Sequence, residues 1–321
     1  MRSLSGMAIA TLALITAAPT LAADFRGLRP AYPTSWETGE DNPLRFEAGM
    51  RYWMSWGGQE AAIAGQGLSV NDQTHILELH TRIDDLSTQS YVKTLAGLGV
   101  DTRGSYTFGS TSNNIGGDSA IGYVGADFGW MLMGEMENGV AAGPLVGYHY
   151  WKDAPDIGRG NYITALAPDG SIAGGNSSKD DLDIHALRLG VSAAANLDNG
   201  FNLQAELAAI PYAHVTGVLG PHSIIEPGFY KSSPTSLTGH GYGVMGELMA
   251  GFSPTENLTI RLGGRAWYLQ GDLEATFDTK IVVPNANPAL NPTVINQAFV
   301  AASEYARIFR YGALVELTGR F

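Results

Sequence analysis

Histidines and carboxylates are the residues of this sequence from which catalysis or metal binding would be built. The chain has seven histidines, and none stands in a metal-ligand spacing such as His-Glu-x-x-His. It contains no Gly-x-Ser-x-Gly nucleophile motif and no phosphate-binding P-loop. The motifs therefore predict neither a metal site nor another cofactor, and any chemistry depends on how the fold gathers scattered charges.

Charged residues recur at every second position in several otherwise apolar segments, which places them on one face of a strand. In the final segment, Tyr311 and Leu317 share one face, while Arg310 and Glu316 share the other. An apolar face with aromatic residues near its ends, opposite a charged face, is typical of a transmembrane β-barrel strand with a polar interior. The aromatic residue that ends this strand, Phe321, resembles the signal read by barrel-assembly machinery.

The same alternation upstream predicts inward-facing charges of both signs. One interpretation is a hydrated, salt-bridged interior that holds a narrow barrel together, and the other is a solute path whose charge rings select ions. Because about eight strands already give an interior filled by side chains, a barrel of about ten leaves little room for a wide pore. The predicted lumen charges are Arg45, Glu47, Arg51, Glu78, Asp127, Arg188, Glu206, Glu247, Arg261, Arg265, Glu316 and Arg320.

These segments predict an all-β fold, a closed antiparallel up-and-down barrel that crosses a membrane. We count ten strands, one of them a long strand over about 74–100 with a bulge near Asp84-Asp85 where the alternation changes face. Twelve strands are the alternative if that segment or a long loop hides a hairpin. A closed barrel leaves no unpaired edge, as a lipid environment requires.

Connections of two lengths are expected between the strands. Short and long connections alternate, which is the outer-membrane layout of tight periplasmic turns and long extracellular loops. The expected short turns lie at 101–104, 135–139, 196–200 and 253–257. The expected long loops lie at 57–71, 152–181, 215–239 and 271–303, with a short second outer loop at about 110–120.

The N-terminus and the net charge indicate where the chain works. Residues 1–23 have a positive start, an apolar stretch and small residues before a cleavage site, which predicts a signal peptide. Residues 24–321 then form one barrel domain in the outer membrane of a Gram-negative bacterium. A formal net charge of -12 without a basic stripe argues against nucleic-acid binding.

Several short motifs resemble a known family. The motifs are Thr81-Arg82-Ile83-Asp84-Asp85, Tyr91-Val92-Lys93, Gly147-Tyr148-His149-Tyr150, Leu187-Arg188-Leu189-Gly190-Val191 and Ser253-Pro254-Thr255-Glu256-Asn257. With ten strands they resemble the omptins, which are outer-membrane proteases, over most of the mature chain. The resemblance implies a site in which an Asp-x-Asp pair of the second outer loop faces an Asp-x-His pair of the fourth. A histidine oriented by one carboxylate activates water while the other carboxylates hold it.

The sequence departs from that site at most of its positions. The second outer loop carries only Asp118, and in the fourth loop Gly220 stands where the aspartate before His222 is expected. Asp183-Ile184-His185 is the nearest substitute, but it opens the sixth strand, where a polar strand start at the membrane rim is the simpler interpretation. The weak catalytic candidates are therefore Asp118, Asp183, His185 and His222.

Three functions remain open. The first is a non-proteolytic, omptin-like barrel whose long loops bind a host factor, lipopolysaccharide or a neighbouring protein. The second is an omptin-type endopeptidase, and the third is a narrow porin-like channel. The expected partners are outer-membrane lipid with lipopolysaccharide, the barrel-assembly machinery and a surface or host ligand. The missing carboxylates favour the first function over the second, and the small barrel favours it over the third.

Overall fold

A computed structural model describes residues 43–63, 65–136, 139–166, 172–177, 179–197, 200–226, 228–287 and 291–321. The chain divides into two units, Met1–Asn42 and Pro43–Phe321, and every described residue belongs to the second. The predicted signal peptide and residues 24–42 lie outside the described residues. Among the residues that are described, no helix is long and apolar enough to cross a membrane.

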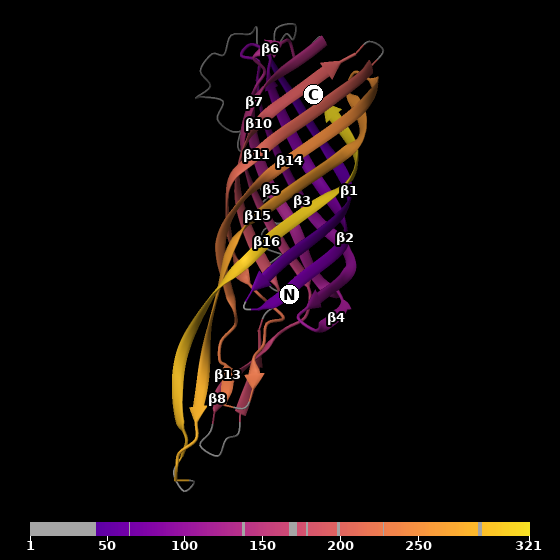
Figure 1. The fold of residues 1–321 in the computed structure, drawn as a ribbon. Helices are drawn as coiled ribbons and strands as arrows, with labels where there is room; N and C mark the ends of the chain where they lie inside the picture. The colour runs from indigo at the N-terminus through magenta and orange to yellow at the C-terminus, as the bar shows by residue number, and fades with distance from the viewer. Residues whose placement is uncertain are drawn as a thin grey trace, which may run out of the picture. The chain divides into compact units, whose positions relative to one another are not determined.

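Ten long strands form one closed antiparallel barrel, which confirms the predicted fold class and the count of ten (Figure 1). The sheet closes because β15 and β16 pair with each other as well as with their other neighbours in the ring. In chain order the barrel strands are β1 (Leu44–Ile63), β2 (Gln66–Asp85), β3 (Ser90–Phe108), β5 (Gly116–Trp130), β7 (Gly139–Asp156), β10 (Asp181–Asn196), β11 (Phe201–Val218), β14 (Ser236–Thr255), β15 (Leu258–Val283) and β16 (Thr293–Arg320).

Six short strands lie at the ends of the barrel. Two of them, β8 and β9, pair only with each other, and the rest extend the main sheet. They are β4 (Thr111–Asn114) on β3, β6 (Met133–Gly134) on β7, the pair β8 (Asn161–Leu166) and β9 (Ile172–Asn176), and β12 (Ile225–Glu226) with β13 (Phe229–Lys231), which joins β15.

Tight turns gather at one end of the barrel, as the sequence predicts for the periplasmic side. Two expected turns are found, one between β10 and β11 and one between β14 and β15. The first contains Gly200 with φ 81°, a backbone conformation that glycine adopts without a steric penalty. A third, expected at 135–139, ends at Gly139 with residues 137–138 outside the described range. The long connections lie at the opposite end, together with the tight β1–β2 turn, and in the orientation expected from the sequence this is the cell-surface end.

The segment at 74–100 is not one long strand but parts of β2 and β3, joined by a turn at 86–89. The sequence conceals this turn because it contains no glycine, proline or asparagine. The carboxylate of Asp85 stabilises it instead, accepting hydrogen bonds from the backbone N–H groups of Ser87 (2.9 Å) and Thr88 (3.3 Å). Gln89 completes the turn with a left-handed φ of 54°.

The turn predicted at 101–104 and the bulge near Asp85 are therefore both wrong. Residues 101–104 lie inside β3, where the register shifts opposite the His75/Ile76 step of β2. The strand count is still ten because one missed hairpin replaces one incorrectly placed hairpin.

Three predicted loops are shorter than expected because the strands continue beyond the apolar band. Residues 57–71 are mostly the ends of β1 and β2, which turn tightly at Gly65 with φ 75°. Most of 271–303 is a hairpin of β15 and β16 that extends past the rest of the barrel wall (Figure 1). Of 215–239, only about 219–235 lies between long strands. These segments contain Gly, Asn and Thr, residues that the composition alone assigns to loops.

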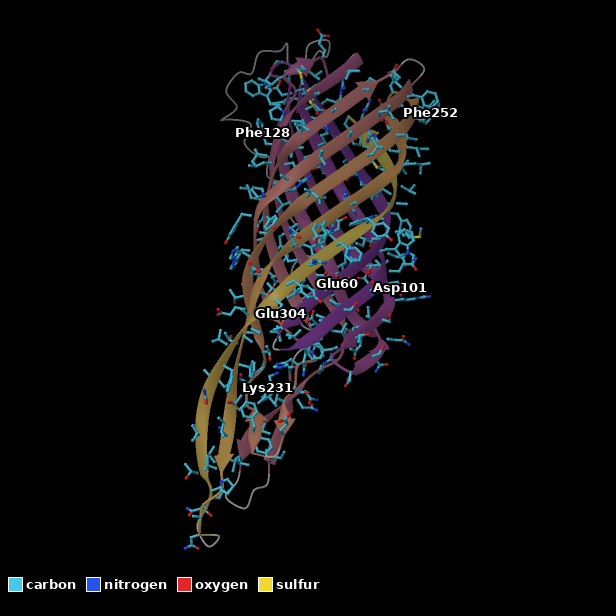
Figure 2. All side chains as sticks on the ribbon, in the orientation of Figure 1. Glu60, Asp101, Phe128, Lys231, Phe252 and Glu304 are labelled. Atoms are coloured by element: carbon cyan, nitrogen blue, oxygen red, sulfur yellow. The ribbon has the colours of Figure 1, made fainter. Side chains whose placement is uncertain are left out.

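Apolar side chains on the outside of the barrel form the surface that faces lipid. Met50, Leu77, Leu207 and Leu262 on four different strands are each more than half exposed. Figure 2 shows aromatic side chains such as Phe128 and Phe252 near the short-turn end. An apolar wall with aromatic residues toward its edges is the exterior of an outer-membrane barrel.

Candidate functional site

Charged side chains fill the lumen from its short-turn end inward. The guanidinium of Arg261 donates to Glu47 (2.7 Å) and to Glu316, and Arg320 lies 3.3 Å from the other oxygen of Glu47. His80 lies 3.9 Å from both carboxylates. This first layer joins four neighbouring strands, β15, β16, β1 and β2, so it strengthens the wall where β1 and β16 close the barrel.

The Glu47–His80–Glu316 cluster resembles a metal site by geometry alone. One oxygen of each carboxylate and a ring nitrogen of His80 all lie within 4.8 Å of one another. However, Arg261 donates to both carboxylates, and Arg51 also pairs with Glu316. A cation would lie against these guanidinium groups, so we assign the cluster to the ion-pair network.

A second layer lies next to the first, farther from the short-turn end. Arg265 pairs with Glu78 and Glu247, both at 2.6 Å, and Arg51 reaches the same two carboxylates at 3.0 and 3.3 Å. Arg51 also pairs with Glu316 of the first layer. All of these side chains are nearly inaccessible to solvent. Because these side chains are buried, each charge depends on its partners to offset the loss of hydration.

A third group of charges covers the opposite wall. Arg188 pairs with Asp127 at 2.7 Å and lies 3.7 Å from Glu206. Lys93 pairs with Glu206 at 2.5 Å and lies 3.8 Å from Asp127. The four side chains come from β3, β5, β10 and β11 and form a closed square of alternating charge.

The charges predicted from alternation lie on the inner wall and, with the exception of Arg45, in these three groups. Arg45 is half-buried and lies opposite Asp84 in the β1–β2 register. The prediction missed Lys93, His80 and Asp72, which pairs with Arg310 at 2.8 Å. The alternation of the last strand already placed Arg310 inward, so that signal was available.

An aromatic layer lies next to these charges in the lumen. Tyr123 stacks on Trp151 with ring centres 4.7 Å apart, and Trp151 contacts Trp267 at 4.9 Å and Trp53 at 6.1 Å. Arg265 lies 5.1 Å from the centre of the Trp53 ring, so it links the aromatic layer to the ion pairs. All four rings are buried, so they fill much of the lumen at this level.

Glycines make room for these rings on the neighbouring strands. Gly97 is the direct cross-strand partner of Tyr123, and Gly129 is the partner of Tyr91. A Cβ atom added to either glycine would lie within 2.4 Å of the partner's ring. Each ring therefore lies over a glycine backbone, which is how a barrel of ten strands holds such large side chains.

The outer part of the lumen is largely apolar, apart from buried polar groups such as the Arg310–Asp72 ion pair. Inward-facing aliphatic and aromatic side chains pack there into one buried cluster. This cluster was not predicted from the sequence, because most of these inward positions were assigned to loops. The cluster includes Ile63, Val70, Phe108, Ile157, Ile184, Ile210, Val215, Leu237, Leu273 and Ile308.

The connections after β7 and β11 are joined by hydrogen bonds at the cell-surface end. Ser177 Oγ donates to the carbonyl of Gly220 at 2.6 Å and accepts from the N–H of Gly160 at 3.0 Å. The N–H of Gly220 in turn donates to the carboxylate of Asp180 at 3.3 Å. These bonds hold the two connections together as a cap, by which we mean residues 157–160, 177, 179–180, 219–226 and 228–235.

His222 is buried in this cap. Its Nδ1 lies 2.8 Å from Thr235 Oγ1, and its ring packs against Phe277 (4.9 Å) and Phe108 (6.3 Å). Burial and, to a lesser degree, the charge of Lys231 lower the pKa of His222 to about 4. Within the described residues no carboxylate is hydrogen-bonded to it, so His222 lacks the acid that a water-activating histidine needs.

Two other titratable groups are buried in the cap. Burial raises the pKa of Asp180 to about 8 and lowers the pKa of Lys231 to about 8. Lys231 Nζ donates to the backbone carbonyl of His222 at 2.5 Å. The other oxygen of Asp180 has no hydrogen-bond partner among the described residues. Burial in the cap therefore disfavours the carboxylate form of Asp180 and the ammonium form of Lys231.

The cap is expected to loosen as pH rises, because of Asp180. Its pKa in the folded protein, about 8, lies above the 3.8 usual for an aspartate, so the cap is most stable with Asp180 protonated and weakens as pH rises between these two values. Asp180→Asn cannot ionise, so its cap should not lose stability in this way as pH rises. We expect hydrogen exchange in 219–226 to be slower in the variant than in the native protein at pH 9.

The comparison isolates Asp180, because His222 and Lys231 contribute equally to both proteins at each pH. The difference in protection should shrink steadily as the pH is lowered from 9 to 5. Asp118→Asn is the matched control, since Asp118 is 80% exposed. A difference that is the same at both pH values would contradict the assignment.

The remaining catalytic candidates lie apart from His222. Asp118 is exposed on β5 and lies 3.6 Å from Arg159. Asp183 and His185 lie on the outer wall of β10, since Ile184 between them faces the core. Asp183 pairs with Lys152 at 3.3 Å, and His185 Nδ1 lies 2.5 Å from the hydroxyl of Tyr148. The described residues do not gather acid and histidine in one cleft.

His185 belongs to an exterior belt of tyrosine and histidine, in line with the polar strand start at the membrane rim expected for Asp183 to His185. His185, His214 and His240 lie directly opposite one another on β10, β11 and β14. Elsewhere on the wall, the hydroxyl of Tyr52 lies 2.5 Å from His75 Nδ1. Amphipathic rings at this level are typical of the boundary between lipid and headgroups.

Solved structures with a similar fold are outer-membrane β-barrels. The outer membrane protease OmpT from Escherichia coli aligns with a TM-score of 0.56 and 11% identity, over 89% of this chain and 99% of that chain. The translocator domain of the autotransporter NalP from Neisseria meningitidis gives a TM-score of 0.36 at 10% identity, covering 98% of each chain. The outer membrane protein OprG from Pseudomonas aeruginosa gives a TM-score of 0.34 at 11% identity, over 87% of this chain and 95% of that chain.

No protein-family model and no curated protein sequence matches this chain. The closed ten-stranded barrel, the apolar exterior and the fold shared with OmpT define the class of protein. It is an outer-membrane β-barrel protein, and its place is the outer membrane of the cell.

Proposed function

We propose that this chain is an omptin-like outer-membrane barrel that does not cleave peptides and that acts by binding at the cell surface. The observation that carries the proposal is the filled interior. Ion pairs, aromatic rings and an apolar cluster follow one another along the lumen, and the cap covers its outer end. The outer surface is therefore the part of the protein that we expect to bind other molecules.

An omptin-type endopeptidase is less well supported by the positions of the candidate residues. His222 is buried among Phe108, Phe277 and Thr235 instead of lining a cleft. Asp183 is occupied by Lys152, and His185 is oriented by a tyrosine hydroxyl where a protease histidine would have a carboxylate.

A channel is also less well supported. Charge rings select ions only where they line an aqueous path. Here the arginines lie within hydrogen-bond distance of the glutamates, and a layer of four aromatic rings lies next to them. The ion pairs hold the wall together, which is the structural interpretation of the lumen charges.

Lipid and lipopolysaccharide are proposed as the surroundings of the exterior belt. Lys152, His185, His214 and His240 lie on the outer wall near the cell-surface end, where they are placed to contact headgroup phosphates. Assembly by the barrel-assembly machinery through Phe321, which is 83% exposed, is part of the same proposal.

A peptidase assay tests the non-proteolytic part of the proposal. The protein is refolded with lipopolysaccharide, folding is verified by heat-modifiable gel mobility, and a dibasic and a general peptide library are added. We expect no specific cleavage above a no-protein control. Specific cleavage that His222→Ala or His185→Ala abolishes would overturn the proposal.

A further inference from the structure

The hairpin of β15 and β16 continues beyond the barrel wall. The pairing of β14 with β15 ends at Ser236–Thr276, and the pairing of β1 with β16 ends at Ile63–Ser303. The two strands remain paired with each other as far as Val283 and Thr293. Figure 2 shows Glu304 where β16 leaves the barrel. This projecting hairpin is the longest feature at the cell-surface end (Figure 1).

The two edges of the projecting hairpin differ. The edge of β15 is covered by the segment that contains β13: Phe229 lies opposite Ile281, and the N–H of Val282 donates to Gly228 at 2.8 Å. The edge of β16 from Thr293 to Ala302 pairs with no other strand among the described residues. Its free N–H and C=O groups are the template onto which another strand is added.

The open edge lacks the usual protection against such pairing. Thr293–Ala302 reads Thr-Val-Ile-Asn-Gln-Ala-Phe-Val-Ala-Ala, with no charge and no proline. Natural edge strands are commonly blocked by lysine, proline or a bulge. The covered strand β15 carries Glu274, Asp278 and Lys280 over the same stretch, so the absence of charge is confined to the open edge.

The backbone direction at Gln297 determines which groups point outward. The carbonyl of Gln297 accepts a hydrogen bond from Thr279 Oγ1 on β15 at 3.0 Å, so it faces into the hairpin. Backbone groups alternate in direction along a strand, so those of Asn296 and Ala298 point to the open edge. A second strand added there forms its hydrogen bonds with those two residues and not with Gln297.

The open edge is complementary to itself about Gln297. In an antiparallel pair with a two-fold axis at Gln297, Val294 of one strand lies opposite Val300 of the other. Ile295 lies opposite Phe299, which already packs on Phe277 with ring centres 5.8 Å apart. β-branched and aromatic cross-strand pairs of this kind stabilise a sheet, and no like charges meet.

We propose that the β16 edge pairs in this way with the β16 edge of a second copy of the chain in an opposing outer membrane. Both copies run from the hairpin tip toward their own barrel, so antiparallel pairing puts the two barrels at opposite ends. The partner is therefore on another membrane surface. This proposal names one partner for the surface binding proposed above and rests on it only for the outward direction of the hairpin.

Single cysteines test the pairing directly, because the native sequence has none. Gln297→Cys in proteoliposomes is expected to give a disulfide-linked dimer under mild oxidation, since facing residues outside the hydrogen-bonded pairs lie about 4.5 Å apart between Cα atoms. Val294→Cys and Val300→Cys vesicles should cross-link only when mixed. Lys280→Cys, on the neighbouring strand, is the control that should stay monomeric.

Vesicle turbidity supplies the second readout. Native proteoliposomes are expected to aggregate, and Ala298→Pro should prevent it, because the lost N–H points away from β15 and the hairpin stays paired. Heat-modifiable mobility verifies that this variant is folded. Dimers of Val294→Cys alone, or no dimer of folded Gln297→Cys protein, would overturn the proposal, whatever the peptidase assay gives.

Discussion

Replacing Arg265 with methionine is expected to lower the free energy of unfolding by roughly 3–5 kcal/mol, the usual effect of leaving a buried charge without its partner. Arg265 pairs with Glu78 and Glu247 and lies over Trp53, all in the closed lumen. Methionine fills part of the volume but leaves two carboxylates with less compensation. The measurement is urea unfolding in detergent micelles, with the folded fraction read from heat-modifiable gel mobility.

Arg103→Met is the matched control, because Arg103 is 82% exposed and its partner Asp101 is also on the surface. An exposed pair contributes about 0–1 kcal/mol, so this variant should unfold close to the native midpoint. Adding Glu78→Gln and Glu247→Gln to Arg265→Met should recover part of the lost stability. If Arg265→Met and Arg103→Met lower the free energy of unfolding equally, the buried ion pairs do not stabilise the barrel in this way.

Gly97→Val is expected to destabilise the barrel by about 3 kcal/mol or more, from overpacking together with the loss of a charged hydrogen bond. The new Cβ would lie 2.4 Å from the Tyr123 ring. That ring cannot move aside without leaving both Glu78, to which its hydroxyl donates, and Trp151, on which it stacks. The same urea unfolding experiment measures the effect.

Gly117→Val is the control for this substitution, since nothing lies within 4 Å of the position its Cβ would take. It should change the free energy of unfolding by no more than about 0.5 kcal/mol. In addition, Gly97→Val should have little further effect in a Tyr123→Ala background, because the two residues occupy one space. Additive losses in the double variant would show that the glycine is not there to accommodate the ring.

Strand alternation predicted much of the fold, because lipid outside and charges inside impose a period of two on every barrel strand. The final strand is the best example: Tyr311 and Leu317 are exposed to lipid, and Arg310 and Glu316 are buried in the lumen. The hairpin at 86–89 was missed because its turn depends on the Asp85 side chain and not on glycine or proline.

The contacts in the lumen could not be predicted from a sequence alone. Gly97 and Tyr123 are neighbours only because of the β3–β5 register, which alternation does not specify. The same limit applies to Arg51, whose partners come from three other strands. Charge sign and face were predictable, whereas the choice of partner depends on register.

The candidate catalytic residues show how little a motif says without its position in the fold. Asp183 and His185 have the spacing of an acid–histidine pair, yet β10 presents them to the outside of the wall. His222 has the expected place in a loop, but the cap buries it. The chain therefore resembles the omptins in strand number and turns, but these side chains do not form the acid–histidine site that the resemblance implies.

The central claim is that the lumen is closed and that the protein acts through its outer surface. Single-channel recording of the refolded native protein in a planar lipid bilayer tests it most directly, with insertion verified by protease protection of the barrel. The ion-pair, aromatic and apolar layers predict a baseline without discrete openings at any applied voltage below membrane breakdown. Reproducible, ion-selective openings from the native protein would contradict the account.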